Sequence, residues 1–111
     1  MDTEIATARI RALNDAARRW HADGVMHFAP GIAALHPKEQ AAILDRVRTF
    51  DDFTPDNDPH GEHDFGSFEH NRRTIFWKID YYDLLLHYGS RDPSDPALTR
   101  RVLTILLAEE Y

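Results

Sequence analysis

Residues 51–83 decide the fold and read DDFTPDNDPHGEHDFGSFEHNRRTIFWKIDYYD, an acidic, turn-rich segment followed by the most aromatic part of the chain. The part from 51 to 64 contains no Lys or Arg, and Pro55, Pro59 and Gly61 favour turns. We therefore expect an acidic loop over 51–64, with strands after it.

The segment after this loop has the composition of strands. Residues 65–69 and 74–82 are rich in aromatic and β-branched side chains, and the polar residues 70–73 between them predict a turn. A third strand is expected over 84–88. Together these segments predict an antiparallel β-meander.

Alternation along the second strand assigns its side chains to two faces, because neighbouring residues of a strand point to opposite sides. The apolar face, which we expect in the core, consists of Ile75, Trp77, Ile79 and Tyr81. The other face mixes aromatic and charged side chains, namely Phe76, Lys78, Asp80 and Tyr82. Exposed aromatic residues beside charges are typical of protein-binding surfaces. The alternative is an ordinary amphipathic outer face with a Lys78–Asp80 ion pair.

The first half of the chain predicts two helices and a short strand. Apolar residues at helical spacing indicate a helix over 3–20, which Gly24 ends. The alternating segment 25–28 predicts an edge strand, followed by a turn at 29–31. A second helix is expected over 37–49, because it begins with a proline suited to a first helical turn.

The C-terminal segment 96–109 predicts a third helix, since Asp95 is suited to the N-cap and Pro96 to the first helical position. The side chains expected to face the core are Leu98, Val102, Ile105 and Leu106, with Leu103 and Leu107 beside them. The order helix, strand, helix, three strands, helix describes an α+β fold, in which a small antiparallel β-meander packs against three helices.

Composition limits the class of protein. The chain of 111 residues is 42% hydrophobic, enough for one core, and we expect a single domain over 1–111. It has no cysteine, which excludes disulfides and thiolate nucleophiles. No apolar run suits a signal peptide or a membrane span, so we expect a cytoplasmic protein that contacts no membrane. The net charge of −6 disfavours direct nucleic-acid binding and suits a protein partner with a basic face.

The acidic loop also contains candidate metal ligands. His60, His63 and Asp64 offer imidazole and carboxylate groups, and His70 or His87 could complete the set from a neighbouring strand. A calcium loop of the EF-hand type is not expected, because its twelfth position is a serine instead of a glutamate. Loops rich in His and Asp are common without a metal, so we expect no cofactor.

Several parts of the chain together resemble a known family. They are Phe50–Pro59 (FDDFTPDNDP), Gly61–Gly66 (GEHDFG), Ile75–Asp83 (IFWKIDYYD) and Arg100–Thr104 (RRVLT). They resemble a small bacterial family of unknown function that has an Arg-Val-Leu-Thr motif near the C-terminus. The resemblance covers about the last two-thirds of the chain.

The resemblance carries over no catalytic residue, because the family is uncharacterised. It implies a short cytoplasmic protein of the kind often found on plasmids and other mobile elements, and it suggests a role in countering host defence. The motif Arg101-Val102-Leu103-Thr104 lies in the expected C-terminal helix. We therefore expect the motif to be, at least partly, a packing feature.

The sequence favours a non-enzymatic interaction protein of the antirestriction or anti-CRISPR kind, which binds a basic, nucleic-acid-binding partner. The predicted binding surface consists of Asp56, Asp58, Glu62, Asp64, Phe76, Lys78, Asp80 and Tyr82. The alternative is a metal-dependent hydrolase or nuclease that uses His60, His63 and Asp64. A further hypothesis is homodimerisation, through a free edge of the meander or through the C-terminal helix.

Overall fold

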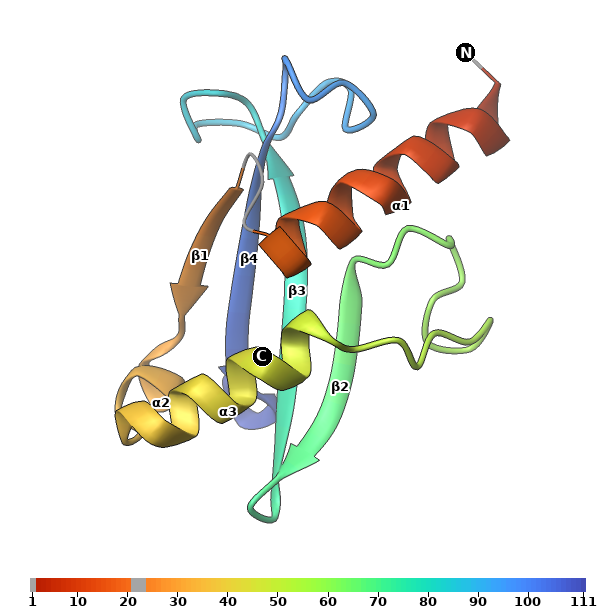
Figure 1. Ribbon diagram of the computed structural model, residues 1–111. Helices are drawn as coiled ribbons and strands as arrows, with labels where there is room; N and C mark the ends of the chain where they lie inside the picture. The colour runs from red at the N-terminus through yellow and green to blue at the C-terminus, as the bar shows by residue number, and fades with distance from the viewer. Residues whose placement is uncertain (1, 21–23) are drawn as a thin grey trace.

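A four-stranded β-sheet forms the centre of the computed structural model, which describes residues 2–20 and 24–111 (Figure 1). Along the chain the elements are α1 (Thr3–Trp20), β1 (Gly24–Phe28), α2 (Pro30–Ala33), α3 (Pro37–Arg48), β2 (Phe65–His70), β3 (Arg73–Tyr82), β4 (Arg100–Leu107) and the 3-10 helix η1 (Ala108–Glu110). The expected α+β class is confirmed. No helix in the described ranges is both long and apolar enough to cross a membrane.

The sheet has the strand order β1-β4-β3-β2. The expected antiparallel hairpin of β2 and β3 is confirmed, and its turn contains Asn71 and Arg72 at φ 48° and 66°. Positive φ at both positions is typical of a two-residue hairpin turn. Because β4 pairs antiparallel with β3 but parallel with β1, the sheet is mixed, and the expectation of a purely antiparallel meander is wrong.

The expected C-terminal helix is instead the central strand β4. Asp95 does cap a turn, since its carboxylate accepts a hydrogen bond from the Ala97 N–H at 2.9 Å, but no helix follows. A strand with partners on both sides and a largely buried surface has an almost continuous apolar sequence. Such a run can match helical spacing by chance, and the β-branched residues Val102, Thr104 and Ile105 favour the strand.

The segment expected as a third strand, 84–88, is a turn. The Asp83 N–H donates to the Tyr88 carbonyl at 2.7 Å, and the Asp83 carboxylate accepts from the His87 N–H at 2.9 Å. These hydrogen bonds are made within the segment itself, and Leu86 has a φ of 60°. Residues 84–88 therefore provide no extended backbone that could pair with a neighbouring strand. The turn expected at 29–31 is likewise replaced by the short helix α2.

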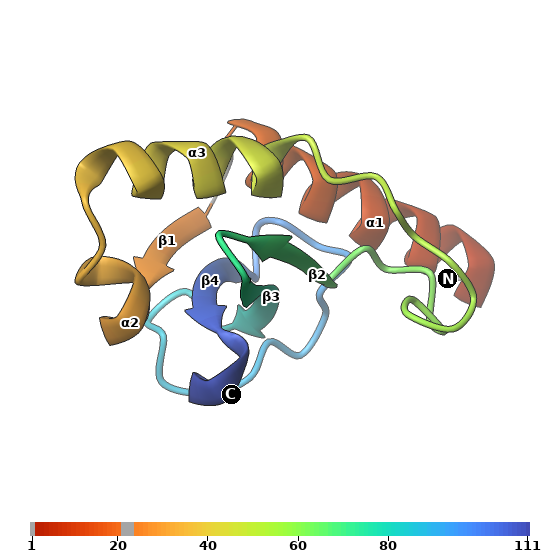
Figure 2. The same cartoon turned by 90° about the horizontal axis from the view of Figure 1, so that it is seen from below.

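The core lies between one face of the sheet and helices α1 and α3, as the view from below shows (Figure 2). Register aligns Phe28, Ile105, Trp77 and Gly66 in one row across the four strands. Trp77 is fully buried, and the expected core positions of β3 are confirmed, with Tyr81 partly buried. Gly66 leaves the space that the Trp77 indole occupies.

Candidate functional site

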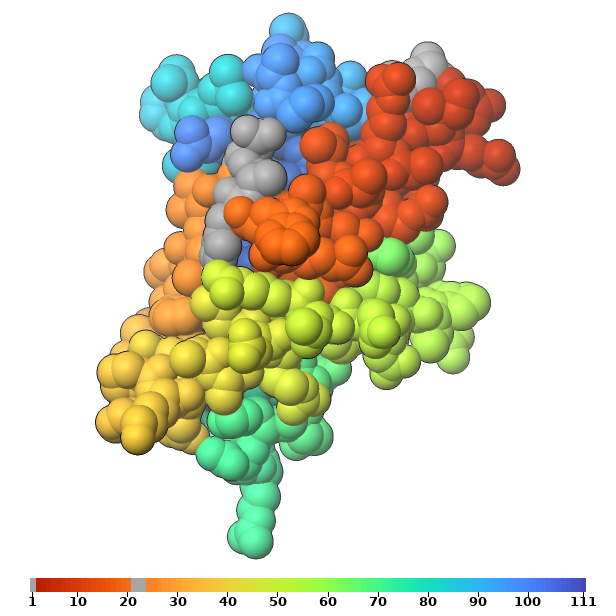
Figure 3. Space-filling model, in the orientation of Figure 1, coloured from red at the N-terminus to blue at the C-terminus, as the bar shows by residue number. Residues whose placement is uncertain are grey.

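The acidic segment, residues 51–64, is held in place by α1. Arg11 donates from Nη1 to the Gly61 carbonyl at 3.0 Å, and Asn14 donates from Nδ2 to the Glu62 carbonyl at 2.9 Å. Within the segment, Asn57 accepts a hydrogen bond from the Thr54 N–H at 2.8 Å. The expected loop is confirmed; it protrudes beside α1, and these hydrogen bonds anchor its C-terminal part to that helix (Figure 3).

His63 joins the acidic segment to α1. Its Nδ1 lies 2.9 Å from Oδ1 of Asp15, its Nε2 lies 3.7 Å from Oδ2 of Asp58, and its ring stacks on Phe53 with the centroids 3.7 Å apart. In the described ranges, no group of three or more His, Asp or Glu side chains is arranged to hold a metal ion. The geometry thus gives no support to a hydrolase that would use His63 with His60 and Asp64 as ligands.

Glu62 belongs to a partly buried polar network. The Tyr81 hydroxyl donates to the Glu62 carboxylate at 2.7 Å and accepts from Asn14 Nδ2 at 2.8 Å. Asn14 in turn accepts from Arg101 Nε at 2.7 Å. Burial and the hydrogen bond to Glu62 raise the pKa of Tyr81, so this hydroxyl remains a donor. Arg101 of the Arg-Val-Leu-Thr motif therefore has a packing role, on a strand and not on the expected helix.

The carboxylates of the acidic segment differ in accessibility. The Asp58 side chain is only 6% exposed and accepts from the His63 N–H at 3.3 Å. Asp56 is exposed, as predicted, and the neighbouring Asp51 and Asp52 are exposed too. These three aspartates, which we call the exposed acidic residues, are the carboxylates of the loop that a partner reaches most easily.

Asp64 is half-buried, and burial together with the nearby Glu62 carboxylate raises its pKa. A raised pKa means that the folded protein favours the protonated carboxyl, so its ionisation opposes folding at neutral pH. We expect Asp64→Asn to raise the midpoint of thermal unfolding at pH 7. The difference should shrink as the pH falls through the raised pKa of Asp64 in the folded protein, and it should be lost below about 3.9, the ordinary value for aspartate. A midpoint that falls at pH 7 would contradict this assignment.

A second surface is the open face of the sheet, turned away from α1 and α3. Phe76, Lys78, Asp80 and Tyr82 lie on it and are partly exposed, as the alternation predicted. Register places four side chains of β1 and β4 on the same face, namely His27 and Thr104 beside Lys78, and Val25 and Val102 beside Asp80. Lys78 Nζ lies 2.8 Å from Oδ2 of Asp80, and this hydrogen bond raises the pKa of Lys78.

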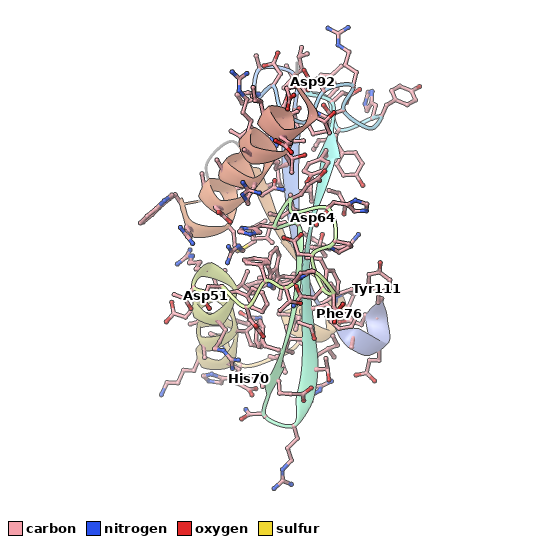
Figure 4. The ribbon with its side chains drawn as sticks, turned by 90° about the vertical axis from the view of Figure 1, so that its right-hand side faces the viewer. Asp51, Asp64, His70, Phe76, Asp92 and Tyr111 are labelled. Carbon is pink, nitrogen blue, oxygen red and sulfur yellow. The ribbon has the colours of Figure 1, made fainter. Side chains whose placement is uncertain are left out.

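The open face and the acidic segment lie on different sides of the molecule. Phe76 packs edge-on against Tyr111, and Figure 4 shows these two rings on one side of the sheet, with Asp51 on the other and Asp64 between. The network of Glu62 with Tyr81 also lies on the helix side. The eight residues predicted as one binding surface are therefore divided between the acidic segment and the open face, and Asp58 and Glu62 of the acidic segment point inward to structural contacts.

Sequence reasoning missed the buried polar residues of α1. Asn14 and Arg18 are both fully buried, and they lie one helical turn apart, in line with the buried Ala17. Polar residues within an apolar stripe were the available signal, because a buried polar side chain in a native protein usually has a specific partner. Their partners lie on distant segments, which the spacing does not reveal.

Comparison with known proteins identifies a family but no characterised relative. The family described as "Protein of unknown function (DUF3768)" matches residues 28–110. No curated protein and no solved structure matches the chain. The two surfaces described above are therefore the features of the protein from which a function can be proposed.

Proposed function

The chain belongs to the DUF3768 family of proteins of unknown function, and we propose that it is a non-enzymatic interaction protein that binds a basic protein surface through its acidic segment. The observation that carries this proposal is an acidic loop that is anchored on α1 and that exposes Asp51, Asp52 and Asp56. Residues 51–64 contain no Lys or Arg, and α1 holds the loop at Gly61 and Glu62.

A fixed loop favours binding, because fewer side-chain and backbone conformations are lost when the partner arrives. Exposed carboxylates without neighbouring cations in the loop also attract a basic surface and accelerate association, most strongly at low salt. Because the open face lies on the other side of the sheet, we assign the basic partner to the acidic segment and not to Phe76, Lys78, Asp80 or Tyr82.

We extend the proposal to the class of partner. A basic surface that a small acidic protein can occupy is typical of nucleic-acid-binding proteins, whose phosphate contacts are made by Lys and Arg. This agrees with the expected role in bacteria or their mobile elements, where an antirestriction or anti-CRISPR-like protein would block a host-defence protein. In this proposal the acidic segment takes the place of the nucleic-acid backbone.

The test is reversal of charge at the exposed acidic residues, Asp51→Lys, Asp52→Lys and Asp56→Lys combined. A partner recovered at equal stoichiometry from a host lysate, then purified, should bind this variant at least tenfold more weakly in surface plasmon resonance. The wild-type affinity should also fall as salt rises.

A matched control places the same change in net charge elsewhere, with Glu4→Lys, Asp45→Lys and Glu109→Lys combined. All three residues are exposed and lie outside the acidic segment. This control should bind within about threefold of the wild-type chain, because the local field and not the net charge positions the partner. Binding that survives reversal at Asp51, Asp52 and Asp56 would exclude the acidic segment as the site.

A further inference from the structure

β1 is an edge strand of the sheet, and among the described residues no other strand pairs with its outer side (Figure 1). The Ala29 N–H donates to the Ile105 carbonyl at 2.9 Å, so the backbone of Ala29 faces β4. Because successive residues of a strand direct their backbone groups to opposite edges, the N–H and C=O of Met26 and Phe28 point outward. Within the described ranges, no hydrogen bond outside the sheet ladder reaches these groups.

The other edge strand, β2, is protected. Arg46 donates from Nη1 to the Glu69 carbonyl at 3.1 Å, which occupies part of that edge. Charged side chains on edge strands, as at Glu69, discourage pairing. β1, in contrast, reads GVMHF and contains no Lys, Arg, Asp, Glu or Pro. Within the described ranges, β1 therefore lacks the charged side chains and the side-chain contact with an edge carbonyl that protect β2.

We propose that the strand which pairs with β1 is the β1 of a second copy of this chain, antiparallel to it across a two-fold axis. Outward-facing residues form the hydrogen-bonded pairs of an antiparallel ladder, so Met26 pairs with Met26 of the other copy. The same register sets Val25 opposite His27 of the other copy. Such a two-fold contact is self-complementary, because both copies contribute the same five residues.

The distribution of charge favours this copy-to-copy contact at β1 over one at β2. The chain has a net charge of −6, and two copies repel wherever their acidic segments approach. The acidic segment leads directly into β2, and β1 lies at the far edge of the sheet. Pairing through β1 joins two uncharged strands and keeps the two acidic segments at opposite ends of an eight-stranded sheet.

The contact is small, so the dimer is weak. A ladder of five residues on each side contributes a small favourable free energy, which is opposed by the translational and rotational entropy lost on association. We therefore expect a dissociation constant on the order of 10–100 µM. Met26 and Phe28 are partly exposed and pack against the core, and a second strand would cover more of both. The inference is independent of the proposed function, because the pairing of two β1 strands does not require a basic partner at the acidic segment.

Sedimentation equilibrium of the untagged full chain between about 5 and 500 µM tests the proposal. We expect the apparent mass to rise from that of the monomer, 12.8 kDa, toward twice this value. Met26→Pro removes the outward N–H and should raise the dissociation constant at least tenfold, since proline cannot donate to a ladder. Met26→Ala, the matched control, keeps the N–H and should dimerise within about threefold of wild type.

A charge-pair test covers the case in which Met26→Pro fails to fold. Val25→Glu with His27→Glu places carboxylates opposite each other across the axis and should abolish the dimer. Val25→Glu with His27→Lys places unlike charges in the same positions and should restore it. A monomer at every concentration, equal losses in Met26→Pro and Met26→Ala, or a dimer unchanged by the paired carboxylates would each overturn the proposal.

Discussion

Replacing Arg18 with alanine should lower the free energy of unfolding by about 3–5 kcal/mol, the range found when one partner of a buried ion pair is removed. The Arg18 side chain is fully buried. Its Nη1 donates to the carbonyls of Val47 at 2.9 Å and Phe50 at 2.6 Å, and its Nη2 lies 3.0 Å from Oδ1 of Asp15. The substitution leaves all three acceptors without this donor and creates a cavity.

The position of Arg18 explains why the loss should be large. Val47 belongs to the last turn of α3 and Phe50 follows it, so the guanidinium satisfies carbonyls at the negative end of that helix. The same group lies 4.9 Å from the centroid of the Trp77 ring and 5.3 Å from that of Phe53. Arg18 therefore connects α1, the end of α3 and the sheet.

Urea unfolding followed by circular dichroism measures this effect, and Arg18→Lys is the matched control. Lysine keeps the positive charge but lacks the planar group that reaches several acceptors at once. We expect Arg18→Lys to lose about half as much stability as Arg18→Ala. A loss below about 1 kcal/mol for Arg18→Ala, typical of an exposed ion pair, would show that the buried contacts do not contribute as described.

Local periodicity was sufficient to predict the elements that have one buried and one more exposed face. Helices α1 and α3 each have one buried side, and their predicted bounds, 3–20 and 37–49, differ from the observed bounds by one residue at most. The hairpin of β2 and β3 was predicted for the same reason, since residues of β3 alternate between core and open face. In each of these elements the apolar residues recur with one clear period, about 3.6 residues in the helices and two residues in the strands.

The same reasoning failed for β4, because most of its residues are buried. Arg101, Leu103, Ile105 and Leu107 face the helices and are buried, yet Leu106 on the opposite face is buried as well. A strand that loses the contrast between its faces also loses the two-residue period by which it would be identified. Its parallel pairing with β1, which precedes it by more than 70 residues, is a tertiary contact that local sequence does not encode.

The candidate site was predicted in composition but not in geometry. The sequence identified the acidic segment and the outer side chains of β3, because charge and alternation are local properties. It did not show that Glu62 bonds to Tyr81 or that His63 bonds to Asp15, since both contacts join distant segments. Those contacts give Glu62 and His63 a structural role in attaching the loop to the rest of the protein. The accessible charges of the loop are therefore Asp51, Asp52 and Asp56.

Replacing Gly66 with alanine should lower the free energy of unfolding by about 3 kcal/mol, at the upper end of the usual range for overpacking. A Cβ added at Gly66 would lie 2.6 Å from Cε2 and 2.8 Å from Cζ2 of Trp77, and still nearer to Nε1. The indole is fully buried in the row between Ile105 and Gly66, so it has little room to move. Thermal or urea unfolding measures the loss, and emission from Trp77 should shift as the ring is displaced.

Two further variants test whether the loss of stability in Gly66→Ala arises from contact with Trp77 or from the replacement of a glycine as such. Gly89→Ala should be nearly neutral, because its added Cβ would lie 3.9 Å from the nearest other atom, the Tyr81 carbonyl oxygen. Trp77→Phe alone should destabilise the protein by leaving a cavity, but it removes the atoms that the new methyl group meets. The double variant should therefore be more stable than the sum of the two single losses predicts. Additive losses would mean that the strand tolerates the methyl group without contact with Trp77.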